Sequence, residues 1–266
     1  MQFSLIPRFH LFEIEDQPWL PRPFRTYLTD LMTIASRWFA LRTPLLPLLR
    51  RLLDHAKADT IIDLCSGSSG PLRWLSPRLE EVCGRPIQII LTDKYPHFDV
   101  FEAASRESKG HISYWKESID AAAVPSDFEG IRTLFNAFHH FRPDVGRRIL
   151  ADAVAKRRAI GIFEGFERTT FWLMLVLFSP LGVWALTPFI RPIRAGRLFW
   201  TYAVPVVPAM ALWDGLVSCL RTYSPQELSE MVKDLLPQEY VWETGWIQVH
   251  GIPAHVTYLL GYAKVV

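Results

Sequence analysis

Residues 60–71, with the sequence Thr-Ile-Ile-Asp-Leu-Cys-Ser-Gly-Ser-Ser-Gly-Pro, constrain the fold of this chain more than any other stretch. A short apolar segment ends at Asp63, a turn of small residues follows, and residues 72–79 then have a helical pattern. A strand, such a turn and a helix together bring backbone N–H groups close to a bound ligand. A second apolar strand, residues 87–92, ends at Asp93, where open α/β sheets hold ribose hydroxyls. The pattern predicts a ligand site at the carboxyl ends of two neighbouring parallel strands.

Residues 61–70 resemble the first motif of the class I S-adenosylmethionine (SAM)-dependent methyltransferases, in which an acid between apolar residues precedes Gly-x-Gly-x-Gly. Cys65 takes the place of the first glycine and Ser69 that of the third, and Gly70 follows one position later. Asp93 is similar to the ribose-binding acid of the second motif, although the connection between the two motifs is longer than usual. The resemblance extends to the C-terminus apart from one insertion, and it implies SAM as the cofactor.

The resemblance also places the expected cofactor contacts on loops that follow successive strands. Residues 111–115 read as a third strand that leads to Asp120, which matches the position that contacts the adenine amino group in these methyltransferases. An aspartate that only stabilises a surface turn is the alternative. The expected cofactor-binding residues are Asp63, Cys65, Ser66, Gly67, Ser68, Gly70, Asp93, Lys94, Ser118, Ile119, Asp120 and Asn136.

The candidate catalytic residues follow the next two strands. Residues 131–135 form an expected fourth strand, and Asn136-Ala137-Phe138-His139-His140-Phe141 come next. This segment resembles the apolar-His-His-apolar sequence found after the fourth strand in many small-molecule methyltransferases, and it favours methyl transfer over hydride transfer. A fifth strand, residues 159–163, leads to Glu164. We expect His140, His139 or Glu164 to act as general base if the acceptor is a hydroxyl; a turn hydrogen bond or a helix cap is the alternative role.

Alternating strands and helices predict a parallel sheet with right-handed crossovers. A helix with a capping-box sequence begins at Ser224 and runs to about Leu236, and residues 241–249 and 255–264 then alternate like two antiparallel strands. The predicted fold class is α/β, a Rossmann-like, seven-stranded, mostly parallel sheet with an antiparallel C-terminal hairpin, N-terminal helices and a hydrophobic insertion after the fifth strand. Dehydrogenase sheets normally stay parallel, so the hairpin favours the methyltransferase fold.

The domain prediction is a single domain over residues 1–266, with an N-terminal helical cover over residues 1–57. Apolar residues recur at helical spacing over residues 24–41, a second helix is expected up to Ala56, and an extended, structured arm precedes both. We expect Trp19 in this arm to pack in the core, with a place in the substrate pocket as the alternative.

The insertion, residues 168–213, contains two uncharged runs, residues 169–190 and 198–213, separated by three arginines (Arg191, Arg194 and Arg197). The first run reaches the roughly 20 residues that span a bilayer, but prolines interrupt both runs. A spanning hairpin would also place the arginines outside, against the usual basic bias. Two interpretations are favoured: a lid over an apolar cavity, and a membrane-surface patch with arginines at lipid headgroups. Asp214, directly after the insertion, is expected to cap a helix or to face the pocket.

Composition limits the partners. Half of the 266 residues are hydrophobic and the net charge is only +2, a balance that does not indicate a nucleic-acid partner. Three widely spaced cysteines predict neither a disulfide framework nor a zinc site, and no metal is expected. No secretory signal is visible, so we expect a cytoplasmic protein, peripheral at the inner face of the membrane if the insertion binds lipid. The oligomeric state stays open.

The function most consistent with these features is SAM-dependent methylation of a hydrophobic small molecule or lipid-like acceptor. The first alternative is a nucleotide-dependent oxidoreductase, because its fold shares the first two motifs. The second is a non-catalytic, membrane-associated protein on a degenerate methyltransferase fold, since Cys65 and Ser69 depart from the glycine pattern.

Overall fold

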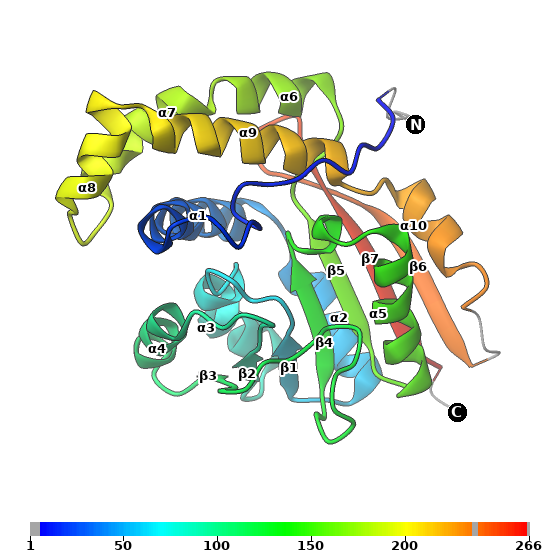
Figure 1. Ribbon diagram of the computed structural model, residues 1–266. Helices are drawn as coiled ribbons and strands as arrows, with labels where there is room; N and C mark the ends of the chain where they lie inside the picture. The colour runs from blue at the N-terminus through cyan, green and yellow to red at the C-terminus, as the bar shows by residue number, and fades with distance from the viewer. Residues whose placement is uncertain (1–5, 236–238, 265–266) are drawn as a thin grey trace.

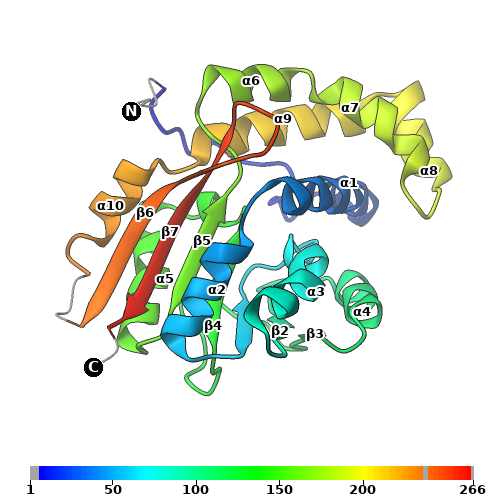
Figure 2. The same cartoon turned by 180° about the vertical axis from the view of Figure 1, so that it is seen from behind.

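A seven-stranded sheet lies at the centre of the computed structural model, which describes residues 6–235 and 239–264 (Figures 1 and 2). The strand order is β3-β2-β1-β4-β5-β7-β6; β1 to β5 run parallel, and β7 is antiparallel to both β5 and β6. The strands are β1 (Thr60–Asp63), β2 (Gln88–Leu91), β3 (Ile112–Tyr114), β4 (Ile131–Phe135), β5 (Ile160–Glu164), β6 (Tyr240–Gln248) and β7 (His255–Ala263). The predicted fold class, including the antiparallel C-terminal hairpin, is confirmed.

Helices cover both faces of the sheet. One face is covered by α2 (Leu46–Ala56), α3 (Leu72–Cys83) and α4 (Phe98–Glu107), and the other by α5 (Pro143–Ala155) and α10 (Pro225–Val232) (Figures 1 and 2). The strands serve both layers because successive side chains point to opposite faces. Ile61 and Phe163 therefore pack with α2 and α3, whereas their neighbours Ile62 and Ile162 pack with α5 and α10.

The ends of most elements lie within a few residues of the prediction. The capping box is formed: Ser224 Oγ accepts from the Glu227 N–H, and Glu227 bonds the Ser224 N–H in return. The helix that starts there ends at Val232, and the predicted end near Leu236 lies outside the described residues. The first five residues of the predicted N-terminal arm also lie outside them.

The insertion folds into a helical layer that we call the roof, residues 170–221. It consists of α6 (Thr170–Leu177), α7 (Ser179–Leu186), η2 (Thr187–Phe189), α8 (Ala195–Leu198), η3 (Phe199–Ala203) and α9 (Val206–Arg221). The roof lies above α1 (Arg22–Arg42), at one edge of the sheet (Figure 1). Val183, Val207 and Met210 of the roof pack against Tyr27 and Leu28 of α1 in a third apolar cluster. The roof and α1 therefore form one packed unit.

Helix length and bending decide how the roof can relate to a bilayer. Among the described residues, no single helix has both the length and the apolar character to cross one. Two pairs of neighbouring helices have the required length and apolar character only when the two helices of a pair are counted together. These pairs are bent by 45° (Thr170–Leu177 with Ser179–Phe189) and by 78° (Ala195–Ala203 with Val206–Arg221).

Arg197 does not lie at the surface, so the expectation of three arginines at headgroups is wrong for this residue. Its side chain is 1% exposed, it is ion-paired with Asp30 of α1, and its guanidinium donates to the carbonyls of Ile190 (2.7 Å) and Pro192 (2.8 Å). A buried charge is costly unless it is paired and hydrogen-bonded. Arg197 therefore fixes the turn between the two halves of the roof to α1, whereas Arg191 and Arg194 stay exposed.

Gly130, at the start of β4, offers a test of this architecture. Its φ is +130°, and an added Cβ would lie 2.5 Å from the Thr60 carbonyl oxygen at the start of β1. We expect Gly130→Ala to lower the free energy of unfolding by at least about 2 kcal/mol, since both the backbone strain and the clash oppose it. Gly182→Ala, in α7 with nothing within 4 Å of the new atom, is the matched control and should not destabilise. Equal unfolding midpoints in denaturant for the two variants would contradict this packing.

Candidate active site

The loop after β1 has left-handed backbone at four of its residues. Cys65 and Ser69 have φ values of +56° and +69°, and Gly67 and Gly70 have +45° and +51°. Residues other than glycine rarely adopt this region, yet the loop keeps it at the two positions where the motif usually has glycine. Backbone of this kind turns successive N–H groups inward and makes an anion-binding concavity. The departure from the glycine pattern therefore leaves the loop shape intact.

Asp63 fixes this loop through hydrogen bonds. Its carboxylate accepts hydrogen bonds of 2.7 Å from both Ser66 Oγ and Thr133 Oγ1, and its carbonyl accepts from the Thr92 N–H. Burial raises the pKa of Asp63 to about 7, against the opposing effect of the two hydroxyl donors. Asp63 thus links the ends of β1, β2 and β4 and positions the loop.

Asp93, at the end of β2, meets the same loop. Its Oδ2 accepts from the Gly67 N–H at 3.0 Å, and its Oδ1 accepts from the Tyr95 N–H at 2.8 Å. Next along the edge, Lys94 is 2.8 Å from Asp120, and the Ile119 N–H donates to the Asp93 carbonyl. Ser118 Oγ donates to the Lys94 carbonyl. The cofactor-site residues predicted after β1, β2 and β3 are therefore brought together.

Asn136, predicted at the same site, lies at the end of β4 and braces the neighbouring strand. Its N–H donates to the Phe163 carbonyl, and its Oδ1 accepts from the Gly165 N–H at 2.6 Å. These bonds fix the segments that leave β4 and β5 relative to each other.

Glu164, at the end of β5, is fully buried and uses both carboxylate oxygens. Oε1 accepts from the N–H groups of Phe138 (2.7 Å) and His139 (3.3 Å), which begin the 3₁₀ turn η1 (Phe138–His140). Oε2 lies 2.6 Å from Nδ1 of His139. A carboxylate can only accept here, so Nδ1 carries the proton and the lone pair of His139 is on Nε2. Glu164 therefore orients His139 and is not free to meet an acceptor itself.

The two histidines differ in their surroundings. His139 is 1% exposed, and its Nε2 has no hydrogen-bond partner among the described residues. His140 is half-buried, and its Nδ1 lies 3.1 Å from Asp16 and 3.5 Å from Glu13. Burial lowers the pKa of His140, but these two carboxylates outweigh it and raise the pKa to about 9. His140 is thus protonated at neutral pH, which removes the reason for choosing it over His139 as general base.

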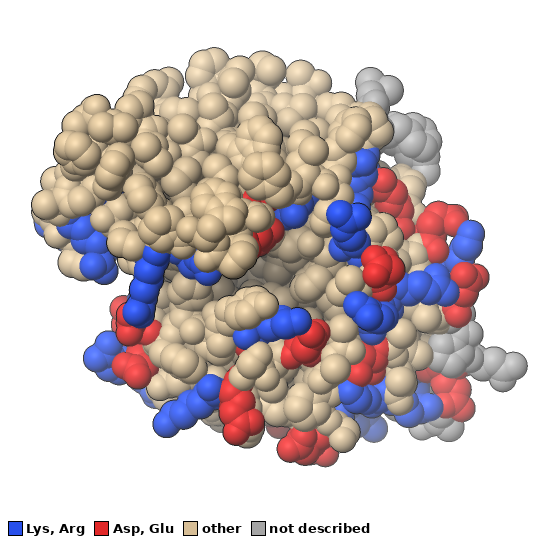
Figure 3. Space-filling view, in the orientation of Figure 1, with Lys and Arg blue, Asp and Glu red and all other residues tan. Residues whose placement is uncertain are grey.

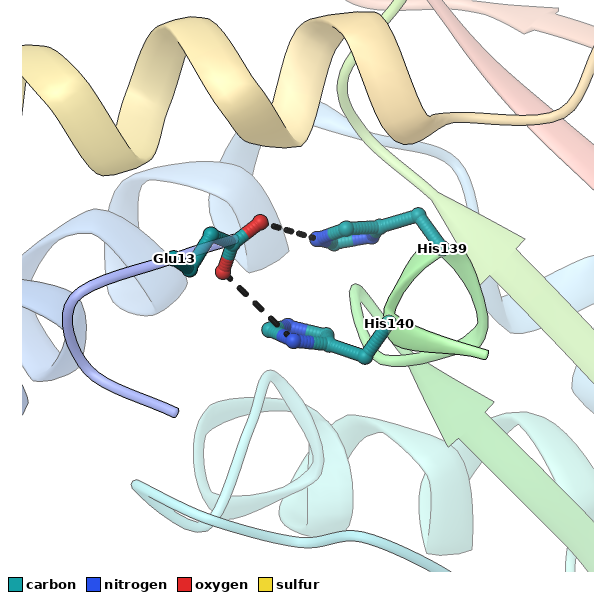
Figure 4. A group of neighbouring side chains, drawn as sticks. All are labelled: Glu13, His139 and His140. Atoms are coloured by element: carbon teal, nitrogen blue, oxygen red, sulfur yellow. Dashed lines mark ion pairs between the residues drawn. The ribbon is translucent and has the colours of Figure 1, made fainter. Parts of the chain in front are cut away.

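Glu13 reaches the histidines from the N-terminal arm (Figure 4). Glu13 is 3% exposed, and its carboxylate faces both imidazole rings from one side, with Oε1 3.8 Å from His139 Nε2 and Oε2 3.5 Å from His140 Nδ1. Ser218 of α9 donates to Oε1 at 3.0 Å, and Arg221 lies 3.2 Å from Oε1 and 2.9 Å from Asp16.

Asp214 fixes the arm to α9. Its two carboxylate oxygens accept from the N–H groups of Ile14 (2.6 Å) and Glu15 (3.1 Å). Asp214 lies inside α9, so the expectation that it caps a helix is wrong. Trp19 is 64% exposed, and the expectation that it packs in the core is wrong.

Sequence reasoning missed Glu13, Asp16, Ser218 and Arg221 as members of this cluster. No local pattern marks them: Glu13 and Ser218 are 205 residues apart, and Asp16 and His140 are 124 residues apart. The one available signal was a run of acids (Glu13, Glu15 and Asp16) in an arm otherwise rich in apolar residues and proline.

The strand order, the antiparallel β7 and the acids that follow β1 and β2 together define the class I SAM-dependent methyltransferase fold. No protein-family model matches the chain, and no curated protein matches it in sequence. Solved structures do match. An O-methyltransferase family protein from Burkholderia thailandensis is 15% identical with a TM-score of 0.50, over 90% of this chain and 59% of that one.

Two further O-methyltransferases are similar to the same degree. NcsB1 of neocarzinostatin biosynthesis, in complex with SAM and 2-hydroxy-5-methyl naphthoic acid, is 13% identical with a TM-score of 0.51, over 91% of this chain and 58% of that one. An O-methyltransferase family 2 protein from Planctomyces limnophilus, in complex with apigenin, is 13% identical with a TM-score of 0.51, over 94% and 63%. The chain spans about three fifths of the length of these structures. At this identity the similarity establishes the fold.

Proposed function

We propose that this protein is a SAM-dependent methyltransferase that methylates a hydroxyl of a hydrophobic, lipid-like acceptor. One observation carries the proposal: the cofactor-type loop with Asp93 and the oriented His139–Glu164 pair lie at the same carboxyl edge of the sheet, on the side where α1 and the apolar roof lie (Figure 1). SAM supplies an electrophilic methyl group, and the enzyme's task is to align donor and acceptor and to exclude water.

The residues after β1 and β2 fit SAM. Gly67 has φ +45°, and its Cα faces open space, with only the Cys65 carbonyl at 3.9 Å from an added Cβ. The carboxylate of Asp93, held by two backbone N–H groups, has the position and chemistry to accept from ribose hydroxyls. Lys94, Ser118, Ile119 and Asp120 continue this edge towards β3, where the adenine end would lie.

His139 is the residue we assign to acceptor activation. Its Nε2 is buried and carries a lone pair, and Glu164 fixes the orientation of the ring. His140 is committed to Asp16, and Glu164 to η1, so neither presents a free acceptor atom. Both similar structures are described as O-methyltransferases, one with bound 2-hydroxy-5-methyl naphthoic acid and one with apigenin, which supports an oxygen acceptor.

Methyl transfer into a lipid extract tests the function directly. We expect the protein to move labelled methyl from SAM into an organic-soluble product of a membrane lipid extract. His139→Ala should slow this transfer by about 10²–10⁴-fold, the usual effect of losing an acid–base group, without changing SAM affinity. His250→Ala, an exposed histidine outside the site, is the matched control. A protein that binds SAM but labels nothing in extracts from several membranes would favour the non-catalytic alternative.

Asp93→Ala tests the cofactor site. Loss of a charged hydrogen-bond acceptor should weaken SAM binding by about 1–3 kcal/mol, measured by titration calorimetry on folded protein. Asp127→Ala, in an exposed loop, should bind SAM like the unmodified chain. Unchanged affinity in Asp93→Ala would place the ribose elsewhere.

The roof supports a membrane as the source of the acceptor. Of the described residues with exposed large apolar side chains, more than half lie in the roof: Met174, Leu175, Leu177, Phe178, Leu181, Trp184, Leu186, Phe189, Ile193, Phe199, Tyr202, Val204 and Trp213. Figure 3 shows this surface without charged side chains, which gather below it. Soluble monomers rarely expose so large a patch. Arg191 and Arg194, exposed beside it, suit lipid phosphates.

The buried ion pair of Arg197 with Asp30 supports surface binding and not spanning, because an inserted hairpin would have to break it. We therefore place the protein at the cytoplasmic face of the membrane, with the roof dipping into one leaflet.

Flotation with liposomes tests the roof. We expect the protein to float with vesicles of phosphatidylcholine and phosphatidylglycerol, and more weakly when the anionic lipid is left out. Phe178 and Phe189 are 61% and 74% exposed, and changing both to Glu should lower partitioning by at least about 10²-fold, since two apolar anchors are lost. Leu41→Glu, on α1 and 59% exposed, is the control. Undiminished flotation of the double variant would contradict the assignment.

A further inference from the structure

We propose that Glu13, His139 and His140 bind a divalent metal ion, and that the ion holds and activates the acceptor oxygen. The inference deepens the proposed function, on which its catalytic part rests, by naming how His139 acts. It departs from the sequence-based expectation that no metal is bound, because Glu13 joins the histidines only through the fold.

The three side chains have the spacing of a ligand set. Each offers one ligand atom, and these atoms all lie within 4.8 Å of one another. The Glu13 carboxylate directs one oxygen to each ring, with Oε1 3.8 Å from His139 Nε2 and Oε2 3.5 Å from His140 Nδ1 (Figure 4). Ligands around a tetrahedral ion at about 2.0–2.2 Å lie roughly 3.4 Å apart, so small rotations of these side chains suffice. The ion must also displace the proton that Nδ1 of His140 shares with Asp16, because an imidazole ligand is neutral.

His139 supplies an independent indication of a ligand. It is 1% exposed, and its Nε2 is aimed at Glu13 with no hydrogen-bond partner among the described residues. Leaving a buried polar atom unpaired is destabilising, so a ligand for this nitrogen is indicated. The other ring nitrogen donates to Glu164 at 2.6 Å, which directs the lone pair of Nε2 towards the cluster. A carboxylate behind a histidine is the usual outer support of a metal ligand.

Glu13 is supported in the same way. Ser218 and Arg221 both bind its Oε1, at 3.0 and 3.2 Å, and fix the carboxylate while Oε2 faces His140. Arg221 also lies 2.9 Å from Asp16 and 3.5 Å from Nδ1 of His140, and this one guanidinium neutralises only part of the negative charge there. Three buried or half-buried carboxylates, Glu13, Asp16 and Glu164, therefore surround the histidines and favour a cation there.

The ligand chemistry indicates zinc. Two imidazoles and one carboxylate form a donor set of catalytic zinc sites, in which the fourth position stays open. A hydroxyl bound there loses its proton to solvent more easily because the ion stabilises the oxyanion. That oxygen then forms the new O–CH₃ bond as the S–CH₃ bond of SAM breaks, and the sulfonium leaves as a neutral thioether.

Cobalt substitution tests the site without reference to activity. The full-length protein is stripped with a chelator, dialysed and titrated with Co²⁺, whose visible ligand-field bands report imidazole and carboxylate coordination. We expect one Co²⁺ per chain, displaced by Zn²⁺. Glu13→Gln and His139→Ala should each abolish the bands. Glu164→Gln should weaken affinity by about 10–100-fold, as outer-shell changes do, while the bands persist. His250→Ala should bind as the unmodified chain does.

The outcomes separate the two proposals. If stripped protein takes up no Co²⁺, or if His250→Ala weakens binding as much as Glu13→Gln, the metal site is wrong. Full methyl transfer by metal-free protein would also overturn it, and His139 would then act as a direct base. Co²⁺ binding that follows the variants as expected, together with no SAM binding, would leave the metal site standing and contradict the methyltransferase. Glu13→Gln keeps the test decisive even if His139→Ala fails to fold.

Discussion

The carboxylate of Glu164 is the interaction on which the rest of the site depends. It lies at the end of β5, satisfies two backbone N–H groups at the start of η1 and holds the ring of His139. A fully buried carboxylate is stable here because both of its oxygens accept hydrogen bonds. The geometry of η1 sets where both histidines point, and the N-terminal arm and α9 then assemble against them. The sheet thus determines the acceptor side of the site as directly as it determines the cofactor side.

Much of the fold is predictable from the sequence because its signals are local. The apolar strand before Asp63, the one before Asp93 and the capping box at Ser224 depend on residues within a few positions of each other. Their consequences, a mostly parallel sheet and an antiparallel hairpin, are confirmed. The His139 and His140 segment also appears where expected, because strand order fixes the loop after β4.

The rest of the site depends on tertiary contacts that no local pattern encodes. Glu13 and Asp16 lie in an arm without helix or strand. The contacts of this arm with Asp214 and Arg221 bring the two carboxylates to the histidines. His139 and His140 differ because they pair with different carboxylates. The sequence alone therefore could not assign different roles to two adjacent histidines. Arg197 is similar: as one of three arginines between apolar runs it looks exposed, yet its partner Asp30 lies 167 residues away.

The attachment of the arm to α9 has a consequence for how the protein is made. During synthesis the arm leaves the ribosome well before its anchor Asp214, which is 200 residues further along the chain. Contacts of such long sequence separation form late, after the sheet has closed most of the intervening loops. Nascent chains therefore acquire the cofactor edge of the sheet before the acceptor side exists. The carboxylates of the arm stay in water until the apolar roof has been synthesised. The site can therefore be completed only after the most hydrophobic segment of the chain has folded.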